Sequence, residues 1–356
     1  MNPEKIKIYD TENISACYFR STVKYPYKKV LLQITERCNL KCQHCFVSAT
    51  SQGKELSIED IKNKIIPKLV QSKTIKVTLT GGEPLVHNNI LEIIKLLRSN
   101  NIEISICTNA VNVTEDLIML AKKLGGIHFN VSLDGFNEKS HGTFRGNNSK
   151  LLFNKIIHNI SRLGQEGLLN GVLVTPNIYA ELYEYKELTE FAKKTGANYV
   201  LFNPLSKFGR GQDSLLKGYS SDLLQKIREI TNDLSDDKFE VVYIRFPEKG
   251  KHIGDCPLGR VLYVFVNGDV AICPYIAFAS NDRDSKYKYK DFIVTNILNE
   301  SCNLDKDLLK YNLPYEQTIM RKCSNDICGK GCYAAKISNG LSINDCDYEL
   351  CGVTTD

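Results

Sequence analysis

The sequence lacks the features that mark secreted and membrane-spanning proteins. Its first residues contain no positively charged segment that leads into an apolar one, and no uninterrupted apolar run is long enough to span a bilayer. We therefore expect a cytoplasmic protein without a membrane partner.

A strong net charge and internal repeats are lacking as well. The net charge is only +5 over 356 residues, and the basic residues are scattered apart from a mixed run at 283–291. Such a run is typical of a solvated loop, so no nucleic-acid partner is expected. At this length, a chain that is 42% hydrophobic exceeds the usual limit of one core, which favours two domains.

Cysteine, by contrast, is plentiful, with thirteen residues in the chain. Cytosolic reductants keep thiols reduced, so in a chain without a secretion signal these cysteines do not indicate a disulfide framework. They indicate metal or cluster ligation instead.

Apolar runs alternate with helical patterns between residues 30 and 205. The helical segments carry apolar residues at helical spacing, and several begin at Ser, Thr or Asn and end at Gly or Asn. Strands that alternate with helices imply right-handed crossovers and a parallel sheet. Six units are too few for a closed eight-stranded barrel, so the prediction is an α/β fold with a partial (β/α)6 TIM-like barrel. The expected strands are 30–35, 74–81, 103–109, 127–135, 171–176 and 199–205, and the expected helices are 57–72, 88–100, 114–125, 149–167 and 180–196.

Polar motifs follow each of the first four expected strands. They are CNLKCQHC at 38–45, GGEP at 81–84, TN at 108–109 and SLDG at 132–135. In folds of this kind the chemistry gathers at the C-terminal ends of the strands. We therefore expect all four motifs to share one rim.

The pattern changes after residue 205. A Gly-rich linker leads to a helix at 220–234, an extended run at 239–246 and a hairpin at Asn267-Gly268. Eight of the thirteen cysteines lie in this part, which indicates a C-terminal cysteine-rich domain folded around metal. The expected organisation is an N-terminal extension at 1–29, the barrel at 30–205, a linker and helix at 206–239, and the cysteine-rich domain at 240–356.

Three cysteines lie close together directly after the first strand, at Cys38, Cys42 and Cys45. Structural zinc takes four ligands, usually from two CxxC-type pairs, and this loop supplies three. A cubane [4Fe-4S] cluster has four irons, so three thiolates leave one iron open for another ligand. The count therefore favours a cluster over zinc.

This CxxxCxxC spacing, with His44 before the third cysteine and Phe46 after it, resembles the signature of the radical S-adenosylmethionine (radical SAM) enzymes. The resemblance implies a [4Fe-4S] cluster whose open iron binds S-adenosyl-L-methionine (SAM). It further implies reductive cleavage of SAM to a 5'-deoxyadenosyl radical that abstracts hydrogen from a substrate.

The same resemblance implies which residues form the SAM pocket. Glycines allow the backbone to approach a ligand, and Glu83 can accept from the methionine ammonium. Arg145 suits the bidentate pairing with its carboxylate, and Val174 would pack on the adenine. From the residues alone, a tight βα turn, a surface ion pair, a helix cap and a core valine are the alternatives. The implied cofactor-binding residues are His44, Phe46, Gly81, Gly82, Glu83, Pro84, Thr108, Asn109, Ser132, Asp134, Arg145 and Val174.

The C-terminal cysteines resemble the SPASM extension of this family, which binds auxiliary iron-sulfur clusters. The spacing from Gly268 to Cys273 fits its pattern, whereas the leading cysteine of the usual CxxC before Cys328 is missing. Zinc is the alternative for this tail. We expect one auxiliary cluster at Cys323, Cys328, Cys346 and Cys351, and another at Cys256, Cys273 and Cys332 with its fourth position open or filled by a non-cysteine group.

Enzymes of this architecture most often modify ribosomally made peptides. The expected function is therefore C-H hydrogen abstraction from such a peptide, giving a crosslink, a thioether, an epimer or an oxidised side chain. The segment after Cys273 lacks the aspartate of sulfatase-maturing relatives, which counts against formylglycine formation. Expected partners are the peptide, an electron donor such as flavodoxin or ferredoxin, and a separate leader-peptide-binding protein, because few residues precede the first strand.

Two other functions fit the sequence. One is radical SAM tailoring of a small molecule, by sugar epimerisation or oxidation or by haem-type decarboxylation. The other is a non-catalytic zinc-binding module. The sequence assigns no catalytic residue, although Cys302 is a candidate hydrogen donor; Cys107, within a strand, is expected to be simply buried.

Overall fold

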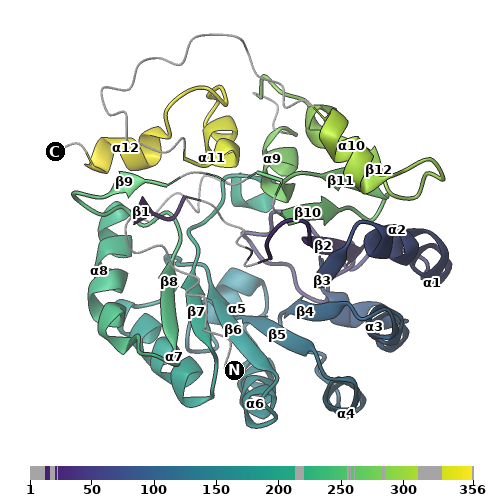
Figure 1. The fold of residues 1–356 in the computed structure, drawn as a ribbon. Coiled ribbons are helices and arrows are strands. Elements are labelled where there is room, and N and C mark those ends of the chain that lie inside the picture. Colours follow the sequence, from purple (N-terminus) through teal and green to yellow (C-terminus); the bar gives the residue numbers. More distant parts are fainter. Residues whose placement is uncertain are drawn as a thin grey trace.

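The computed structural model describes residues 13–16, 21, 23–212, 220–254, 256, 258–259, 261–281, 285–311 and 331–354. Its central element is a curved sheet of ten strands in the order β12-β11-β10-β2-β3-β4-β5-β6-β7-β8 (Figure 1). The strands from β10 through β2 to β8 are parallel, and β11 and β12 are antiparallel to their neighbours. The bounds are Lys28–Thr35 (β2), Thr74–Gly81 (β3), Glu103–Thr108 (β4), Ile127–Ser132 (β5), Leu169–Val174 (β6), Tyr199–Phe202 (β7), Glu240–Tyr243 (β8), Val261–Val264 (β10), Asp269–Ala271 (β11) and Ile293–Asn296 (β12).

The six strands expected before residue 205 all form, and the α/β class is confirmed. The parallel series does not end there, because β8 pairs in register with β7 from Tyr199↔Glu240 to Phe202↔Tyr243. The predicted six-stranded partial barrel is thus confirmed, and β8 extends its parallel series by one strand. The Gly-rich segment after β7 looked like the end of the barrel, but α8 (Ser221–Thr231) serves as one more crossover helix to a seventh parallel strand.

Helices cover the convex face of the sheet (Figure 1). Several begin at capping residues that the sequence predicted: the hydroxyls of Thr114, Ser149 and Ser220 each accept from a backbone N–H in the first turn. Their apolar faces pack on the sheet in one continuous core. The helices are α1 (Ile58–Asp60), a π-helical stretch (Ile61–Ile65), α2 (Ile66–Gln71), α3 (Ile90–Ser99), α4 (Glu115–Leu124), α5 (Ser140–Arg145), α6 (Lys150–Gln165) and α7 (Leu182–Lys194).

The C-terminal part joins the same sheet through β10, which pairs with β2 from Val261↔Lys29 to Val264↔Leu32. The expected hairpin follows, since β10 and β11 are antiparallel and Gly268 adopts φ 86° in the turn between them. The remaining elements are α9 (Pro274–Ala279), α10 (Leu304–Lys310), α11 (Tyr333–Ser338), α12 (Tyr348–Thr354) and the small sheet of β1 (Asn13–Ile14) with β9 (His252–Ile253), which lies beside β8 in Figure 1.

Among the described residues, no helix is both long and apolar enough to cross a membrane.

Candidate active site

The three-cysteine loop begins directly after β2. The Cys38 N–H donates to the Thr50 carbonyl at 2.7 Å, which closes the loop at its base. Within the loop, the N–H of Leu40 lies 3.4 Å from Cys38 Sγ and that of Ala49 lies 3.4 Å from Cys45 Sγ. Donors aimed at sulfur favour a thiolate. All three cysteines line one cavity.

Burial opposes ionisation of these thiols. It raises the pKa of Cys38 to about 11 and that of Cys42 to about 12, although the Arg145 guanidinium lowers both in part. Within the described ranges, no three His, Cys, Asp or Glu side chains are arranged to hold a single metal ion. A cubane cluster binds its thiolates on different irons and so spreads its ligands more widely than one ion does.

Arg210, which lies in the segment expected to be a linker, holds the cysteine loop in place. Its guanidinium donates to the carbonyls of Cys42 and Ala49, both at 2.7 Å, and its backbone N–H donates to the carbonyl of Cys45 at 3.1 Å. The preceding Gly209 has φ +60°, and a Cβ there would lie 2.5 Å from the carbonyl oxygen of Phe46. An arginine between two glycines was the only local signal for this contact.

The glycines of the GGEP motif permit a close approach, but to the protein's own backbone. A Cβ on Gly81 would lie 2.1 Å from the Thr35 carbonyl oxygen, and one on Gly82 would lie 2.3 Å from that of Arg37. The N–H groups of Gly82 and Glu83 donate to these same carbonyls at 2.9 Å. The motif therefore fixes the backbone from which the cysteine loop departs.

Glu83 ties the second and third motifs together. Its buried carboxylate accepts from the Thr108 hydroxyl at 2.7 Å, the Asn109 N–H at 2.7 Å and the Leu85 N–H at 3.1 Å. Burial raises its pKa, and these three donors counter that rise. The Asn109 amide also donates to the Asn39 side chain in the cysteine loop at 2.8 Å.

Arg145 and Asp134, predicted separately, form a buried pair with Nε 2.7 Å from Oδ2. The other Asp134 oxygen accepts from the Thr175 N–H at 2.8 Å. Burial alone would raise the Asp134 pKa, but Arg145 and the nearby histidines hold it below its ordinary value. Arg145 Nη1 lies 3.9 Å from Cys42 Sγ, so the guanidinium bridges the SLDG motif and the cysteine loop.

His44 completes this group. Its ring stacks on Phe144 at 4.0 Å and lies 3.6 Å from the Asp134 carboxylate. Burial lowers its pKa to about 4, so the ring is neutral. Among the described residues its buried Nδ1 has no hydrogen-bond partner.

The other predicted pocket residues are divided between the cavity wall and the layer behind it. Ser132, Val174 and Phe46 line the cavity, and Phe46 packs edge-on against Tyr275 and Phe278. Pro84 and Asp134 are buried but do not line it. The cavity itself has a volume of about 1590 Å³ and extends into the barrel.

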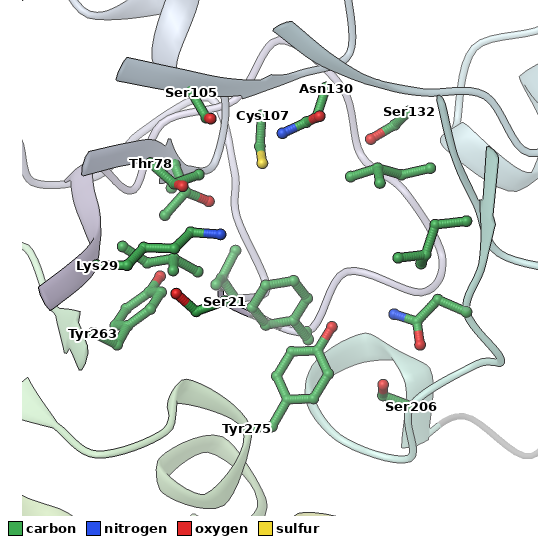
Figure 2. A pocket seen from close by; sticks show the side chains of 18 of the residues that line it. Ser21, Lys29, Thr78, Ser105, Cys107, Asn130, Ser132, Ser206, Tyr263 and Tyr275 are labelled. Carbon is green, nitrogen blue, oxygen red and sulfur yellow. The ribbon is translucent and has the colours of Figure 1, made fainter. Parts of the chain in front are cut away.

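Cys302 is not placed to donate hydrogen into this cavity. It is 6% exposed, belongs to the main core and does not line the cavity wall. Cys107 does line it, on β4 beside Asn130 (Figure 2). The structure thus argues against Cys302 and makes the β4 cysteine a wall residue rather than a core one.

A second group of cysteines lies in the C-terminal part, around β9, α9, α11 and α12. Cys256, Cys273 and Cys332 all contact one hydrophobic cluster, whereas Cys351 packs in a different one around β1 and β9. A hydrogen bond with the Cys256 side chain lowers the Cys332 pKa to about 7. Cys323 and Cys328 lie outside the described residues.

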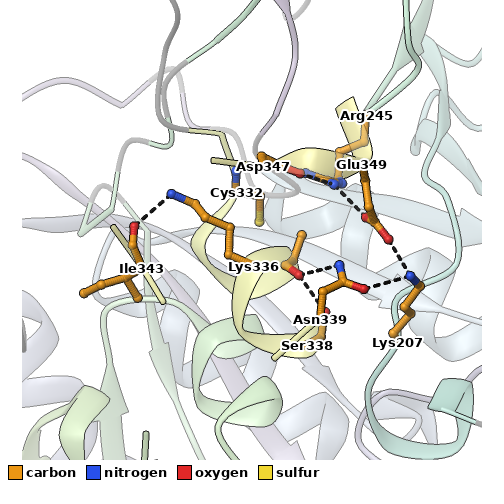
Figure 3. A network of polar contacts seen from close by, with 10 residues as sticks. Lys207, Arg245, Cys332, Lys336, Ser338, Asn339, Ile343, Asp347 and Glu349 are labelled. Atoms are coloured by element: carbon orange, nitrogen blue, oxygen red, sulfur yellow. Dashed lines mark hydrogen bonds and ion pairs between the residues drawn. The ribbon is translucent and has the colours of Figure 1, made fainter. Parts of the chain in front are cut away.

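A polar network fixes this region to the end of β8 (Figure 3). Arg245 donates to both oxygens of the buried Asp347 carboxylate and, at 2.9 Å, to Glu349. Asp347 also accepts from the Cys332 N–H at 3.0 Å. Lys207 donates to Glu349, so two chain segments that follow barrel strands hold the C-terminal cysteines in position.

Comparison with known proteins gives one family match and several relatives. The radical SAM superfamily model matches residues 32–192. The subtilosin biosynthesis protein AlbA of Bacillus subtilis is 26% identical over 68% of this chain and 53% of its own. The mycofactocin maturase MftC of Mycolicibacterium smegmatis is 26% identical over 89% of this chain and 81% of its own. The chain thus spans about half the length of AlbA.

The solved structures confirm the fold. Streptococcus suis SuiB bound to its precursor peptide SuiA has a TM-score of 0.69 at 18% identity, over 91% of this chain and 75% of SuiB. The likeness extends over the C-terminal region as well as the barrel.

Proposed function

We propose, because residues 32–192 match the radical SAM superfamily model, that this chain is an enzyme that cleaves SAM reductively and abstracts hydrogen from a C-H bond of a ribosomally synthesised peptide. The observation that carries the proposal is the cysteine loop at the wall of a large cavity, with GGEP, Asn109 and Arg145 against it. When bound, the [4Fe-4S] cluster and SAM supply a 5'-deoxyadenosyl radical.

Cys38, Cys42 and Cys45 hold the cluster in this proposal. Three observations support the fit: the thiols share one cavity wall, two of the sulfurs have a backbone N–H at 3.4 Å, and Arg145 lies beside the third. These donors stabilise thiolate charge that burial alone would oppose. Arg210 keeps the loop carbonyls fixed, so the sulfurs have little freedom to move.

SAM binds across the ends of β3 to β6. Arg145 recognises its carboxylate, and Asp134 acts behind Arg145 by fixing the guanidinium. Glu83 and the Gly81-Gly82 turn hold the wall beside its ammonium, with Thr108 and Asn109 braced by the same carboxylate. His44, Phe46, Ser132 and Val174 enclose the remaining surface and exclude water, while Pro84 orients the turn.

The relatives support a peptide substrate. AlbA is a bacteriocin biosynthesis protein, MftC is a maturase, and SuiB has been seen with a precursor peptide. A cavity of about 1590 Å³ has room for peptide side chains beside the cofactor. The same proposal includes a flavodoxin or ferredoxin as electron donor and a separate leader-peptide-binding protein.

The C-terminal cysteines hold auxiliary iron-sulfur clusters in this proposal. The shared hydrophobic cluster of Cys256, Cys273 and Cys332 supports their assignment to one site. Cys323, Cys328, Cys346 and Cys351 form the other.

The test is anaerobic incubation of the iron-loaded enzyme with SAM, a reductant and the short peptide encoded beside its gene. A mass change in the peptide together with 5'-deoxyadenosine supports the proposal. Formation of 5'-deoxyadenosine without any peptide change would reject the peptide substrate, and colourless, zinc-containing protein would reject the enzyme.

A further inference from the structure

The part of the cavity wall formed by β10, β2, β3 and β4 carries polar side chains, where barrel interiors are usually apolar. Figure 2 shows Lys29 of β2, Thr78 of β3, Ser105 of β4 and Tyr263 of β10 facing the same space. The strand register explains this gathering: Lys29 lies beside Val261, and Leu31 lies between Tyr263 and Thr78, which in turn pairs with Ser105. These positions come from four neighbouring strands.

Two hydroxyls in this group are left without partners. Thr78 Oγ1 and Tyr263 Oη are fully buried, their residues are 4% and 1% exposed, and neither atom has a hydrogen-bond partner among the described residues. A buried hydroxyl without a partner costs stability. Their placement on a cavity wall is explained if a ligand supplies the missing acceptor.

The charge of the cavity favours an anionic ligand. Among the described residues that line it, seven are lysine or arginine and only Glu83 and Asp305 are acidic. Glu83 already accepts three hydrogen bonds, and Asp305 pairs with Lys28. Burial, with Lys76 adding to it, lowers the Lys29 pKa to about 8, so an anion beside the ammonium would stabilise its charged form.

We propose that Lys29, together with Thr78, Ser105 and Tyr263, binds a carboxylate group of the substrate. A carboxylate accepts from one ammonium and several hydroxyls at once, which matches this set of donors. The inference rests on the proposed function, since it assumes that the substrate enters the barrel. The carboxylate is either an Asp or Glu side chain or the C-terminus of a peptide.

Three isosteric probes separate these sources: N-acetylglutamate α-amide has only a side-chain carboxylate, N-acetylglutamine has only a terminal one, and N-acetylglutamine amide has none. Binding to the iron-loaded, SAM-bound full chain is measured by saturation-transfer NMR. We expect one or both carboxylate probes to bind at least about tenfold more tightly than the neutral probe, as one charge-assisted hydrogen bond allows.

The matched variants are Lys29→Met and Lys76→Met. Each variant removes one positive charge from the cavity wall, because Lys29 and Lys76 both line the cavity and are register partners on β2 and β3. Lys76 forms an ion pair with Glu103 at 3.8 Å and is not in the proposed donor set. Lys29→Met should abolish the preference for carboxylate, whereas Lys76→Met should leave it within about threefold. Equal losses in both variants, or no preference in the parent enzyme, would overturn the inference. Thr78→Val, which replaces the hydroxyl with a methyl, should reduce the preference without loss of fold.

Formation of 5'-deoxyadenosine is recorded in the same samples. Preferential binding of the carboxylate probes without 5'-deoxyadenosine would reject the proposed function and keep the carboxylate site. Formation of 5'-deoxyadenosine without such a preference would reject the site alone.

Discussion

The buried pair of Asp134 and Arg145 allows a quantitative test of how the pocket is built. Asp134 is 0% exposed, and its two oxygens are committed to Arg145 and to the Thr175 N–H. Asp134→Ala leaves the guanidinium buried without its counter-ion, and breaking a buried pair in this way costs about 3–5 kcal/mol. Asp134→Asn keeps an oxygen for one donor but not the charge, so its cost should be about 1–3 kcal/mol.

The assay is urea unfolding of the full chain, followed by circular dichroism and paired with SAM affinity by calorimetry. We expect the unfolding free energy to fall in the order parent, Asn, Ala, and both variants to bind SAM at least about tenfold more weakly, because Arg145 loses its orientation. Glu166→Gln, which removes the exposed pair with Lys122, is the control and should leave both quantities unchanged. If both Asp134 variants unfold and bind SAM like the parent, the Asp134–Arg145 pair neither stabilises the fold nor positions Arg145.

Three further predictions follow from other parts of the site. Gly82→Ala should lower iron content sharply with little loss of helix signal, because its Cβ would lie 2.3 Å from the Arg37 carbonyl beside the cysteine loop; iron content equal to the parent would contradict this. Burial lowers the pKa of His141 to about 3 from its ordinary 6.5, so the unfolded chain binds more protons and the unfolding free energy should fall as the pH drops below about 6.5. His141→Gln should reduce that slope, although buried His44 contributes to it as well, and an unchanged slope would exclude His141 as one of its sources. Asp347→Ala removes the acceptor of both Arg245 and the Cys332 N–H, so it should lower the iron content by the share of one auxiliary cluster and leave 5'-deoxyadenosine formation from SAM in place; a loss of both would show that the two regions fold as one unit.

The strands and the cysteine loop were predictable because their signals are local. Buried parallel strands read as short apolar runs, and β2 to β7 were recognised in this way. The three thiols were recognised as candidate cluster ligands from their spacing in the sequence.

Contacts between distant segments were not predictable from local pattern. The Arg210 guanidinium donates to the carbonyls of Cys42 and Ala49, and the residues around Arg210 in the sequence do not predict these partners. Gly81 and Gly82 were expected to let the backbone approach a ligand; they line the cavity, but the close contacts that require glycine are with the backbone of Thr35 and Arg37.

The polar side chains inside the barrel could not be predicted for a related reason. Side chains of a strand point alternately to its two faces, so a polar residue is normally assigned to the outward face. This pattern would assign Lys29, Thr78 and Ser105, on three separate strands, to the outside of the barrel. Only the register of four strands shows that these side chains face the same cavity. The seventh strand, β8, was missed as a barrel strand because its pairing with β7 depends on a crossover that follows a glycine-rich segment.

Cys38, Cys42 and Cys45 are proposed to hold the cluster that cleaves SAM reductively. The most direct measurement is 5'-deoxyadenosine formed from SAM and dithionite under anaerobic conditions, compared between the parent enzyme and the variant in which all three cysteines are alanine. We expect the parent to form 5'-deoxyadenosine and the variant to form none, with the variant's remaining iron held by the C-terminal cysteines. Equal formation by both proteins, or none by an iron-loaded parent, would contradict it.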